Sequence, residues 1–465
     1  MVDAVPGDLV AVQTGHAADG RTEIGSSRPA TGCNHVPVAT SFRERLTRLR
    51  VDLTPWRASR DFRILVISGS VFFLGGMVGY VALPFQLYQL TGSNFAVGAM
   101  GLVTIVPLVV FGLYGGALAD HVDRRKMLIL TGIAQVAVCA VLLANTLLAS
   151  PQVWVIYVCG ALNAIASSLQ RPSREALFPR VVRHEDMPAA VTLNSLTLQV
   201  GQLAGPALGG VLVGTAGVTW AYAVELVGLV AATLLFLLLG SYKPSEHSTP
   251  PSLRAIGDGI KYAFRRRDLL GTYAVDMVGM FLAMPIVLFP AFATEVLKEP
   301  KLLGLLYSAE AVGAMLATLT SGWARHVHHH GRAVVLATIT WGASVGIAGL
   351  APNIWFAIAF FAVAGGADMI SGLFRAVIWN QTIPDEMRGR LAGIEMLSYS
   401  LGPLGGQSRS GLVADLTSVR TSIVSGGVLC VAGVVVTAAW LKDFWRYDAR
   451  TDEHAVRERQ LRSAG

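Results

Sequence analysis

The chain has 465 residues, of which 53% are hydrophobic and 14% are charged, and its mean hydropathy is +0.54. A typical soluble domain carries about 25% charged residues, so this composition excludes an ordinary soluble protein. The formal net charge of +7 leaves a nucleic-acid partner open until the positions of the 37 Lys and Arg residues are considered.

Residues 1–61 lack the basic start and apolar core of a signal peptide. They are predicted to form a cytoplasmic tail that is largely disordered. Beyond this tail, long uncharged runs alternate with charge clusters and turn signals, and a helix of about 20 apolar residues suffices to cross a bilayer. The runs predict twelve spanning helices in six pairs, near residues 62–119, 127–170, 187–242, 269–326, 333–374 and 391–441.

A polar segment divides these helices into two sets of six. The predicted domains are an N-terminal bundle at 62–240, a cytoplasmic linker with an amphipathic helix at 241–268, a C-terminal bundle at 269–441 and a cytoplasmic tail at 442–465. The halves also resemble each other, since Gly205-Pro206-Ala-Leu-Gly-Gly returns 197 residues later as Gly402-Pro403-Leu-Gly-Gly. The sequence therefore predicts an all-α integral membrane protein with the repeated layout of a secondary transporter.

The basic residues predict the topology. If the N-terminus is cytoplasmic, 31 Lys and Arg residues lie in the cytoplasmic turns and membrane-proximal tails, and only Lys298, Lys301 and Arg420 lie outside. Basic residues are enriched on the cytoplasmic side of membrane proteins, so both termini are expected inside. This distribution explains the positive charge as a topology signal and a contact for anionic lipid, without nucleic acid.

The turn after the second helix reads Gly116-Ala-Leu-Ala-Asp120-His-Val-Asp123-Arg124-Arg125-Lys126. It resembles the G-x-L-a-D-r-x-G-R-[RK] signature of the major facilitator superfamily, in which this element latches the cytoplasmic side of the outward-open state. The resemblance assigns latch roles to Gly116, Asp120, Asp123, Arg124 and Arg125. Two positions depart from the signature, since His121 replaces the usual Arg and Asp123 the usual Gly. The alternative is an ordinary basic turn on the inner side.

The fifth predicted helix contains Gly201, Gly205, Pro206, Gly209 and Gly210 in the order G-x-x-x-G-P-x-x-G-G. This pattern resembles the antiporter motif of exporting facilitators. Glycines four residues apart share one helix face and permit close packing, while a proline loosens the helix. Dimerisation or ordinary packing is the alternative explanation for the glycines.

Two further turns narrow the resemblance. Gln170-Arg-Pro-Ser-Arg-Glu-Ala-Leu-Phe-Pro179 and Pro384-Asp-Glu-Met-Arg-Gly-Arg390 resemble turns of the enterobactin-exporter-like and macrolide-efflux-like facilitators. The resemblance implies a bacterial inner-membrane protein that exports amphipathic drugs or a siderophore in exchange for protons. We expect the protein to function as a monomer. A uniporter or importer, and a non-transporting receptor or scaffold, remain alternatives.

Several features argue against other chemistry. The sequence contains no Gly-Lys dipeptide and therefore no phosphate loop of the G-x-x-x-x-G-K-[ST] type. Its four cysteines show no CxxC spacing, which argues against a disulfide framework or a metal site. We therefore expect that the protein is not an enzyme and binds no cofactor. We expect an ion gradient to be its energy source.

Charges within the spans are the candidates for proton coupling, because a charge in hydrocarbon is costly and usually faces a cavity or a partner. All ten histidines are placed in tails or turns, so carboxylates are expected to carry the proton. The ionisable residues within the predicted spans are Glu225, Asp276, Glu310, Asp368, Glu395 and Arg409. Asp276 and Asp368 are preferred, since the seventh and tenth helices line the central cavity of the facilitator fold. A structural ion pair is the alternative for each carboxylate, and Arg409 is a candidate counter-charge.

Overall fold

A computed structural model describes residues 52–242 and 261–464, without the side chains of residues 113–121, 461–464 and several positions between 385 and 397. The regular secondary structure of these ranges is helical throughout. The first half contains α2 (Thr54–Ala58), α3 (Arg60–Thr91), α4 (Asn94–His121), α5 (Arg124–Thr146), α6 (Val153–Val181), η1 (His184–Asp186), α7 (Met187–Thr215) and α8 (Val218–Phe236). The second half contains α10 (Arg267–Leu282), η2 (Ile286–Leu288), α11 (Phe289–Ala291), η3 (Phe292–Val296), η4 (Pro300–Leu302), α12 (Leu303–Leu319), η5 (Ser321–His326), α13 (His330–Gly349), α14 (Ile354–Thr382), α15 (Asp385–Leu416), α16 (Val419–Trp440), α17 (Lys442–Trp445) and α18 (Glu453–Ala464).

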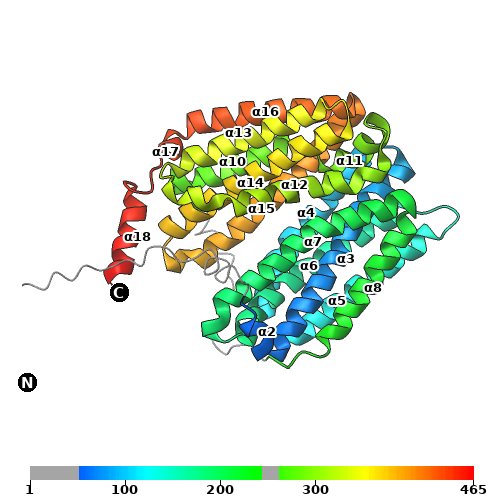
Figure 1. Ribbon diagram of the computed structural model, residues 1–465, viewed down its shortest axis with the longest axis horizontal. Helices are drawn as coiled ribbons and strands as arrows, with labels where there is room; N and C mark the ends of the chain where they lie inside the picture. The colour runs from blue at the N-terminus through cyan, green and yellow to red at the C-terminus, as the bar shows by residue number, and fades with distance from the viewer. Residues whose placement is uncertain (1–51, 243–260, 465) are drawn as a thin grey trace, which may run out of the picture. The chain divides into compact units, whose positions relative to one another are not determined.

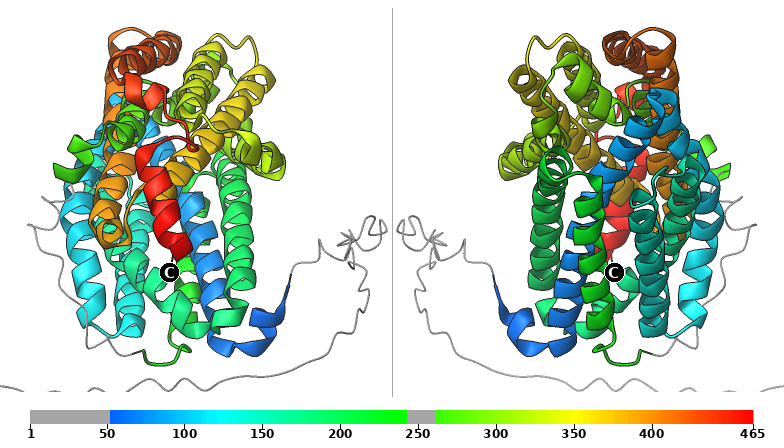
Figure 2. Two further views of the ribbon diagram at one scale, coloured as in Figure 1. Left: turned by 90° about the vertical axis from the view of Figure 1, so that its left-hand side faces the viewer. Right: turned by 90° about the vertical axis from the view of Figure 1, so that its right-hand side faces the viewer.

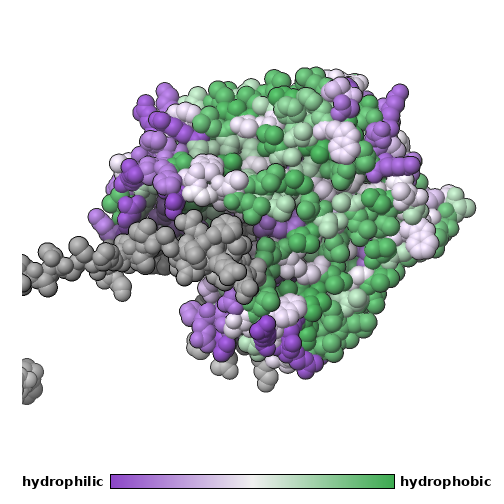
Figure 3. Space-filling model, viewed as in Figure 1, coloured by the Kyte–Doolittle hydropathy of each residue, from purple (hydrophilic) through white to green (hydrophobic). Residues whose placement is uncertain are grey.

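The predicted fold class, an all-α membrane protein, is confirmed. Within the described residues, eleven segments are long and apolar enough to cross a membrane. The predicted span that is not among these eleven segments is the eleventh in chain order, α15, which has 32 residues but is interrupted by polar side chains. It packs against α4, α10 and α16, so much of its surface contacts protein. Figure 3 shows apolar side chains over the flanks of the bundles and hydrophilic ones toward their ends.

The predicted N-terminal tail and the linker fall mostly outside the described residues, whereas the predicted C-terminal tail is described up to residue 464 and contains α17 and α18. Only α2 and the start of α3 represent the tail at 1–61. Of the predicted amphipathic linker helix, residues 261–265 are described and are helical, and α10 begins two residues later.

The helices of the two halves pair in the same pattern; Figures 1 and 2 show the bundles from three sides. In the first half α3 packs on α7 and α8, α5 on α6 and α8, and α4 on α6. In the second half α10 packs on α15 and α16, α13 on α14 and α16, and α12 on α14. Each helix of the second half thus takes the neighbours of its counterpart in the first, as expected for an internal repeat.

The repeat is broken in the seventh span. Regular α-helix stops at Leu282, and Pro285 lies in the irregular stretch before η2, α11 and the π-helical η3. A helix end leaves carbonyl groups without intrahelical partners. Arg409 of α15 donates from Nη1 to the carbonyl oxygen of Leu282 at 2.9 Å, which satisfies one of them.

The two halves contact each other mainly through α4 with α15 and α7 with α12. We call the end of the bundles that carries the α3–α4 and α15–α16 turns the distal end, and the end that carries α2 and α18 the proximal end. In Figure 1 the two halves meet toward the right, at the distal end. The contacts between α7 and α12 include Gly210 with Gly304 and the hydrogen bond from Ser308 Oγ to Leu203 O at 2.9 Å.

Candidate functional site

An ion pair between Asp276 of α10 and Arg375 of α14 lies inside the C-terminal bundle. Oδ1 of Asp276 is 2.5 Å from Nη1 of Arg375, and the two side chains are 4% and 3% exposed. Oδ2 of Asp276 also accepts a hydrogen bond from Ser398 Oγ at 3.4 Å. Buried charges are tolerated when they are paired, so each residue accounts for the presence of the other in the membrane.

Arg375 corrects one sequence interpretation. The topology predicted from the basic residues places Arg375 in the cytoplasmic turn after the tenth span, as one of the 31 basic residues on that side. The structure instead continues α14 to Thr382, seven residues beyond Arg375. The sequence interpretation ended the span at its first basic residue, whereas Asp276 on another helix neutralises this charge and lets the span continue. Arg375 is therefore a site residue that the sequence analysis missed.

The guanidinium of Arg375 keeps unused hydrogen-bonding capacity. Its carbon lies 5.2 Å from the centre of the Tyr399 ring on α15, which places it over an aromatic face. Among the described residues, Nε has no acceptor, whereas Nη1 is in close contact with the carboxylate of Asp276. The pair thus has strong charge attraction, and Nε remains available as a donor.

Asp368 lies two turns before Arg375 on α14 and shares a cavity with Asp276. The cavity has room for about one water molecule. Its lining residues are Asp276, Met280, Thr338, Trp341, Asp368 and Ser371. Thr338 Oγ1 and Ser371 Oγ are 3.2 Å apart. The two preferred carboxylates are therefore brought together beside hydroxyl groups and one guanidinium.

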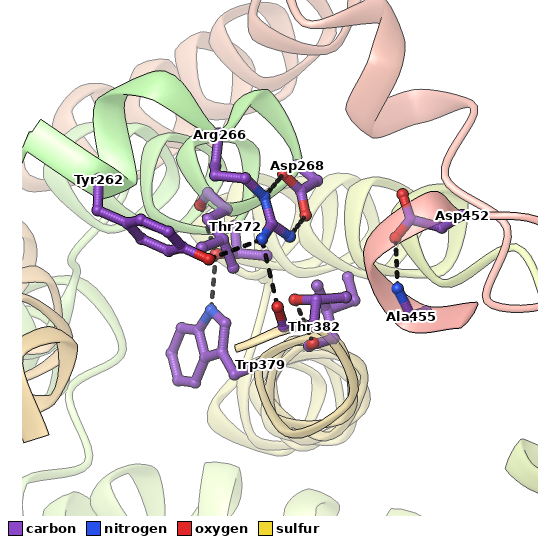
Figure 4. A network of polar contacts seen from close by, with 10 residues as sticks. Tyr262, Arg266, Asp268, Thr272, Trp379, Thr382, Asp452 and Ala455 are labelled. Atoms are coloured by element: carbon purple, nitrogen blue, oxygen red, sulfur yellow. Dashed lines mark hydrogen bonds and ion pairs between the residues drawn. The ribbon is translucent and has the colours of Figure 1, made fainter. Parts of the chain in front are cut away.

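Further polar contacts hold α10 against α14 toward the proximal end. One helical turn from the ion pair, Trp379 Nε1 donates to Thr272 Oγ1 at 2.9 Å. Beyond it, Arg266 binds Asp268 through two nitrogens and donates from Nη1 to the carbonyl oxygen of Thr382 at 3.2 Å, as Figure 4 shows. The same nitrogen donates to Tyr262 Oη at 3.0 Å. These contacts form a ladder that positions Asp276 opposite Arg375.

The other three candidate carboxylates lie outside the Asp276–Asp368 cavity. Glu310 of α12 is partly buried and lies within electrostatic range of Asp368. Glu395 of α15 is partly buried as well and lies within range of Arg375. Glu225 of α8 belongs to the other bundle, where its carboxylate occupies the space that a side chain at Gly79 would need.

Arg409 lies away from the Asp276–Arg375 pair. Its described hydrogen bond goes to the carbonyl of Leu282, at the break in α10. Among the described residues, no carboxylate forms an ion pair with it. Its positive charge therefore lies at a helix C-terminus, where a cation is favourable.

The glycines of the predicted antiporter motif lie in helix contacts. Gly201, Gly205 and Gly209 face α3, where Cβ atoms would approach Phe73, Met77 and Val78 respectively within 3.1 Å. A Cβ on Gly210 would lie 2.1 Å from Gly304 Cα in α12, and a Cβ on Gly304 would lie 2.6 Å from the carbonyl oxygen of Pro206. Backbones this close leave no room for a side chain. The motif thus packs α7 against its own bundle on one face and against the other bundle on the next.

The described members of the predicted latch contact their own bundle. Asp123 accepts hydrogen bonds at the start of α5 from Arg125 N at 2.9 Å and Lys126 N at 3.4 Å, and another from Ser241 Oγ at 2.6 Å. Partial burial alone would raise the pKa of Asp123, but these hydrogen bonds hold it below its usual range. Arg124 donates to Ala176 O at 3.0 Å. Arg125 donates to Leu237 O at 2.5 Å. Gly116 and Asp120 belong to residues 113–121, for which side-chain surroundings are not described.

Comparison with known proteins connects these features to a family. Residues 51–461 match the family model of transmembrane secretion effectors. The enterobactin exporters EntS of Citrobacter koseri and Shigella boydii are each 29% identical over 369 residues, covering 78% of this chain and 87% of those proteins.

Solved structures of transporters share the fold. A POT family transporter in complex with 5-aminolevulinic acid superposes with a TM-score of 0.67 at 10% identity, covering 83% of this chain and 97% of that one. The nucleoside transporter NupG superposes with a TM-score of 0.64 at 13% identity, covering 84% and 100%. A bacterial homologue of ferroportin in the inward-facing state gives 0.65 at 14% identity, covering 83% and 98%.

Proposed function

Since the chain belongs to the transmembrane secretion effector family of the major facilitator superfamily, we propose that it exports amphipathic small molecules by proton antiport and alternating access. The family match and the EntS relatives support transport in general and export in particular. Drugs and siderophores are the proposed substrate classes. The observation that carries the proton coupling is the cavity shared by Asp276 and Asp368 beside Arg375.

The charge balance of this cavity supports one exchangeable proton. Asp276 and Arg375 together are neutral, and within the described residues Asp368 has neither an ion pair nor a hydrogen bond. An unpaired charge in a low-dielectric interior is costly, and protonation of Asp368 removes that cost. We infer that Asp368 takes up and releases the transported proton, while Asp276 and Arg375 respond to its charge.

The orientation follows from the basic residues. With both termini in the cytoplasm, the proximal end faces the cytoplasm and the distal end faces outward. The described contacts between α4 and α15 and between α7 and α12 then close the outer side. We propose a monomer in the bacterial inner membrane, with anionic lipid near its basic inner rim.

Efflux from a pump-deficient host tests this function. Cells that express the protein should export members of a panel of lipophilic drugs and siderophores, and an uncoupler should abolish export. Asp368→Asn should abolish proton-linked export while the protein still reaches the membrane. Asp443→Asn is the matched control, because it neutralises an exposed carboxylate whose partner is Arg267 at 3.1 Å, and it should export normally.

The remaining outcomes separate the alternatives. Export that persists with the uncoupler and with Asp368→Asn would contradict proton antiport. Substrate equilibration without accumulation would indicate a uniporter, uptake an importer, and binding without flux in proteoliposomes a receptor or scaffold.

A further inference from the structure

The first turn of α4 is capped by a residue of the other bundle. The carboxylate of Asp415, near the end of α15, accepts hydrogen bonds from the backbone nitrogens of Asn94 at 2.8 Å and Phe95 at 3.0 Å. It also accepts from Asn94 Nδ2 at 3.0 Å and from Ser93 Oγ at 2.5 Å. One side chain thus receives four hydrogen bonds across the boundary between the bundles.

This arrangement divides the capping of α4 between the two halves of the protein. The first backbone N–H groups of a helix have no partner within the helix. Ser93 Oγ accepts from Ala96 N at 3.1 Å, whereas Asn94 N and Phe95 N depend on Asp415. A carboxylate at this position is also favoured by the partial positive charge of the helix N-terminus. The start of α4 is therefore fully capped only while the two bundles touch.

The surrounding contacts close the same seam. Ser408 Oγ, two turns before Asp415 on α15, donates to Gly98 O at 2.8 Å. A Cβ on Gly411 would lie 2.3 Å from Asn94 O, so α15 and α4 touch backbone to backbone here. The α7–α12 seam closes on the same end through Gly210 and Gly304. Tyr88 Oη donates to Glu295 close by.

We propose that Asp415 is the latch of the distal gate: it holds that end closed by capping α4 across the bundle boundary, and it must release α4 before the end can open. This proposal rests on the alternating access proposed above. It adds a residue whose charge sets the balance between the closed and open distal end. Opening transfers the N–H groups of Asn94 and Phe95 from a carboxylate to water, and neutralising Asp415 lowers the cost of that exchange.

Cysteine labelling in nanodiscs tests the latch without substrate, proton gradient or assumed orientation. In a background whose native cysteines are replaced by alanine, Ser408→Cys reports on the α4–α15 seam and Ser308→Cys on the α7–α12 seam. The two serines are 7% and 3% exposed, so labelling by a water-soluble maleimide requires opening. Asp415→Asn is expected to raise both labelling rates by about 3- to 30-fold, because it replaces charge-assisted hydrogen bonds at a helix N-terminus by weaker neutral ones.

A control separates the latch from an ordinary cap. Asn353 caps α14 within its own bundle, accepting from Phe356 N at 3.0 Å, and Asn353→Ala should leave both rates unchanged. An increase at position 408 alone would mean that only the end of α4 frays and would overturn the proposal, as would no increase at either position. If Asp415→Asn yields no folded protein, Asn94→Ala serves as the second variant, because it removes a single hydrogen bond to the carboxylate. For the proposal to stand, Asn94→Ala must raise both labelling rates, by a smaller factor.

Because the readout needs no transport, the two proposals fail separately. Labelling that responds to Asp415→Asn without proton-linked export would retain the latch and reject the antiport. Proton-linked export without a labelling response to Asp415→Asn would retain the antiport and reject the latch.

Discussion

The Asp276–Arg375 pair makes a quantitative prediction about stability. Both side chains are almost fully buried, at 4% and 3% exposure, so solvent does not screen their attraction. Removing one partner of a buried ion pair costs about 3–5 kcal/mol, because the other charge is left uncompensated. Replacing both partners by neutral polar residues of similar size removes that charge. We therefore expect Asp276→Asn to be strongly destabilising and the double variant Asp276→Asn/Arg375→Gln to recover most of the loss.

The two single variants should differ. Arg375 remains charged at any accessible pH, so Asp276→Asn leaves a permanent buried charge. In Arg375→Gln the remaining carboxylate of Asp276 can be neutralised by a proton. Asp368 faces the same cavity and offers Arg375 a substitute partner, which places the cost of Asp276→Asn near 3 kcal/mol, the lower end of the range. We expect Arg375→Gln to be the milder variant at pH 6.

Equilibrium unfolding in mixed detergent micelles measures the cycle. The coupling energy expected for the pair is about 2–4 kcal/mol. The exposed pair of Arg267 and Asp443, with side chains 71% and 62% exposed, supplies the control. Such pairs typically contribute about 0–1 kcal/mol. A coupling energy for Asp276 and Arg375 no larger than that of the control pair would refute the reasoning.

Two further predictions concern helix packing and capping. Gly210→Leu places a side chain where even a Cβ would lie 2.1 Å from Gly304 Cα, so the distal end should fail to close. We expect normal membrane insertion, loss of export and increased labelling at Ser308→Cys. Labelling at the wild-type rate would contradict the close approach of α7 and α12. Asp123→Ala removes the hydrogen bonds at the start of α5 and should lower the stability at pH 7 by about 1 kcal/mol. The pKa of Asp123 is lowered in the folded protein, so its contribution is present at neutral pH and is lost as the pH falls through that lowered value. The difference between wild type and Asp123→Ala in unfolding assays should therefore shrink in acid, and a difference that grows would refute the assignment.

Local patterns were sufficient for several features of the fold. The uncharged runs located the spanning segments, because the cost of charge in hydrocarbon acts on every residue of a span. The polarity of α15 shows the limit of this rule. Its length predicts a span, although polar residues interrupt it. Contacts with α4, α10 and α16 accommodate these residues, and the sequence of the segment alone does not reveal those contacts.

Local sequence patterns predicted only part of the candidate site. Asp276 and Asp368 were selected because a carboxylate in a span is conspicuous. Arg375 escaped because it lies seven residues before the end of α14 and resembles the start of a basic turn. Its role follows from a partner 99 positions earlier in the chain, and the break that Arg409 stabilises at Leu282 likewise involves a distant helix.

The sequence by itself determined that the chain enters a membrane as paired helices, that its halves repeat, and that small residues recur at fixed spacing on α7. These properties depend on composition and on intervals of a few residues, which local physical chemistry governs. Only the tertiary structure decided which charges neutralise each other, which glycines touch across the bundle boundary, and that Asp415 caps a helix 321 residues away. Those contacts depend on distances in space between remote segments, and the energy of a buried charge is set by the partner that folding brings to it.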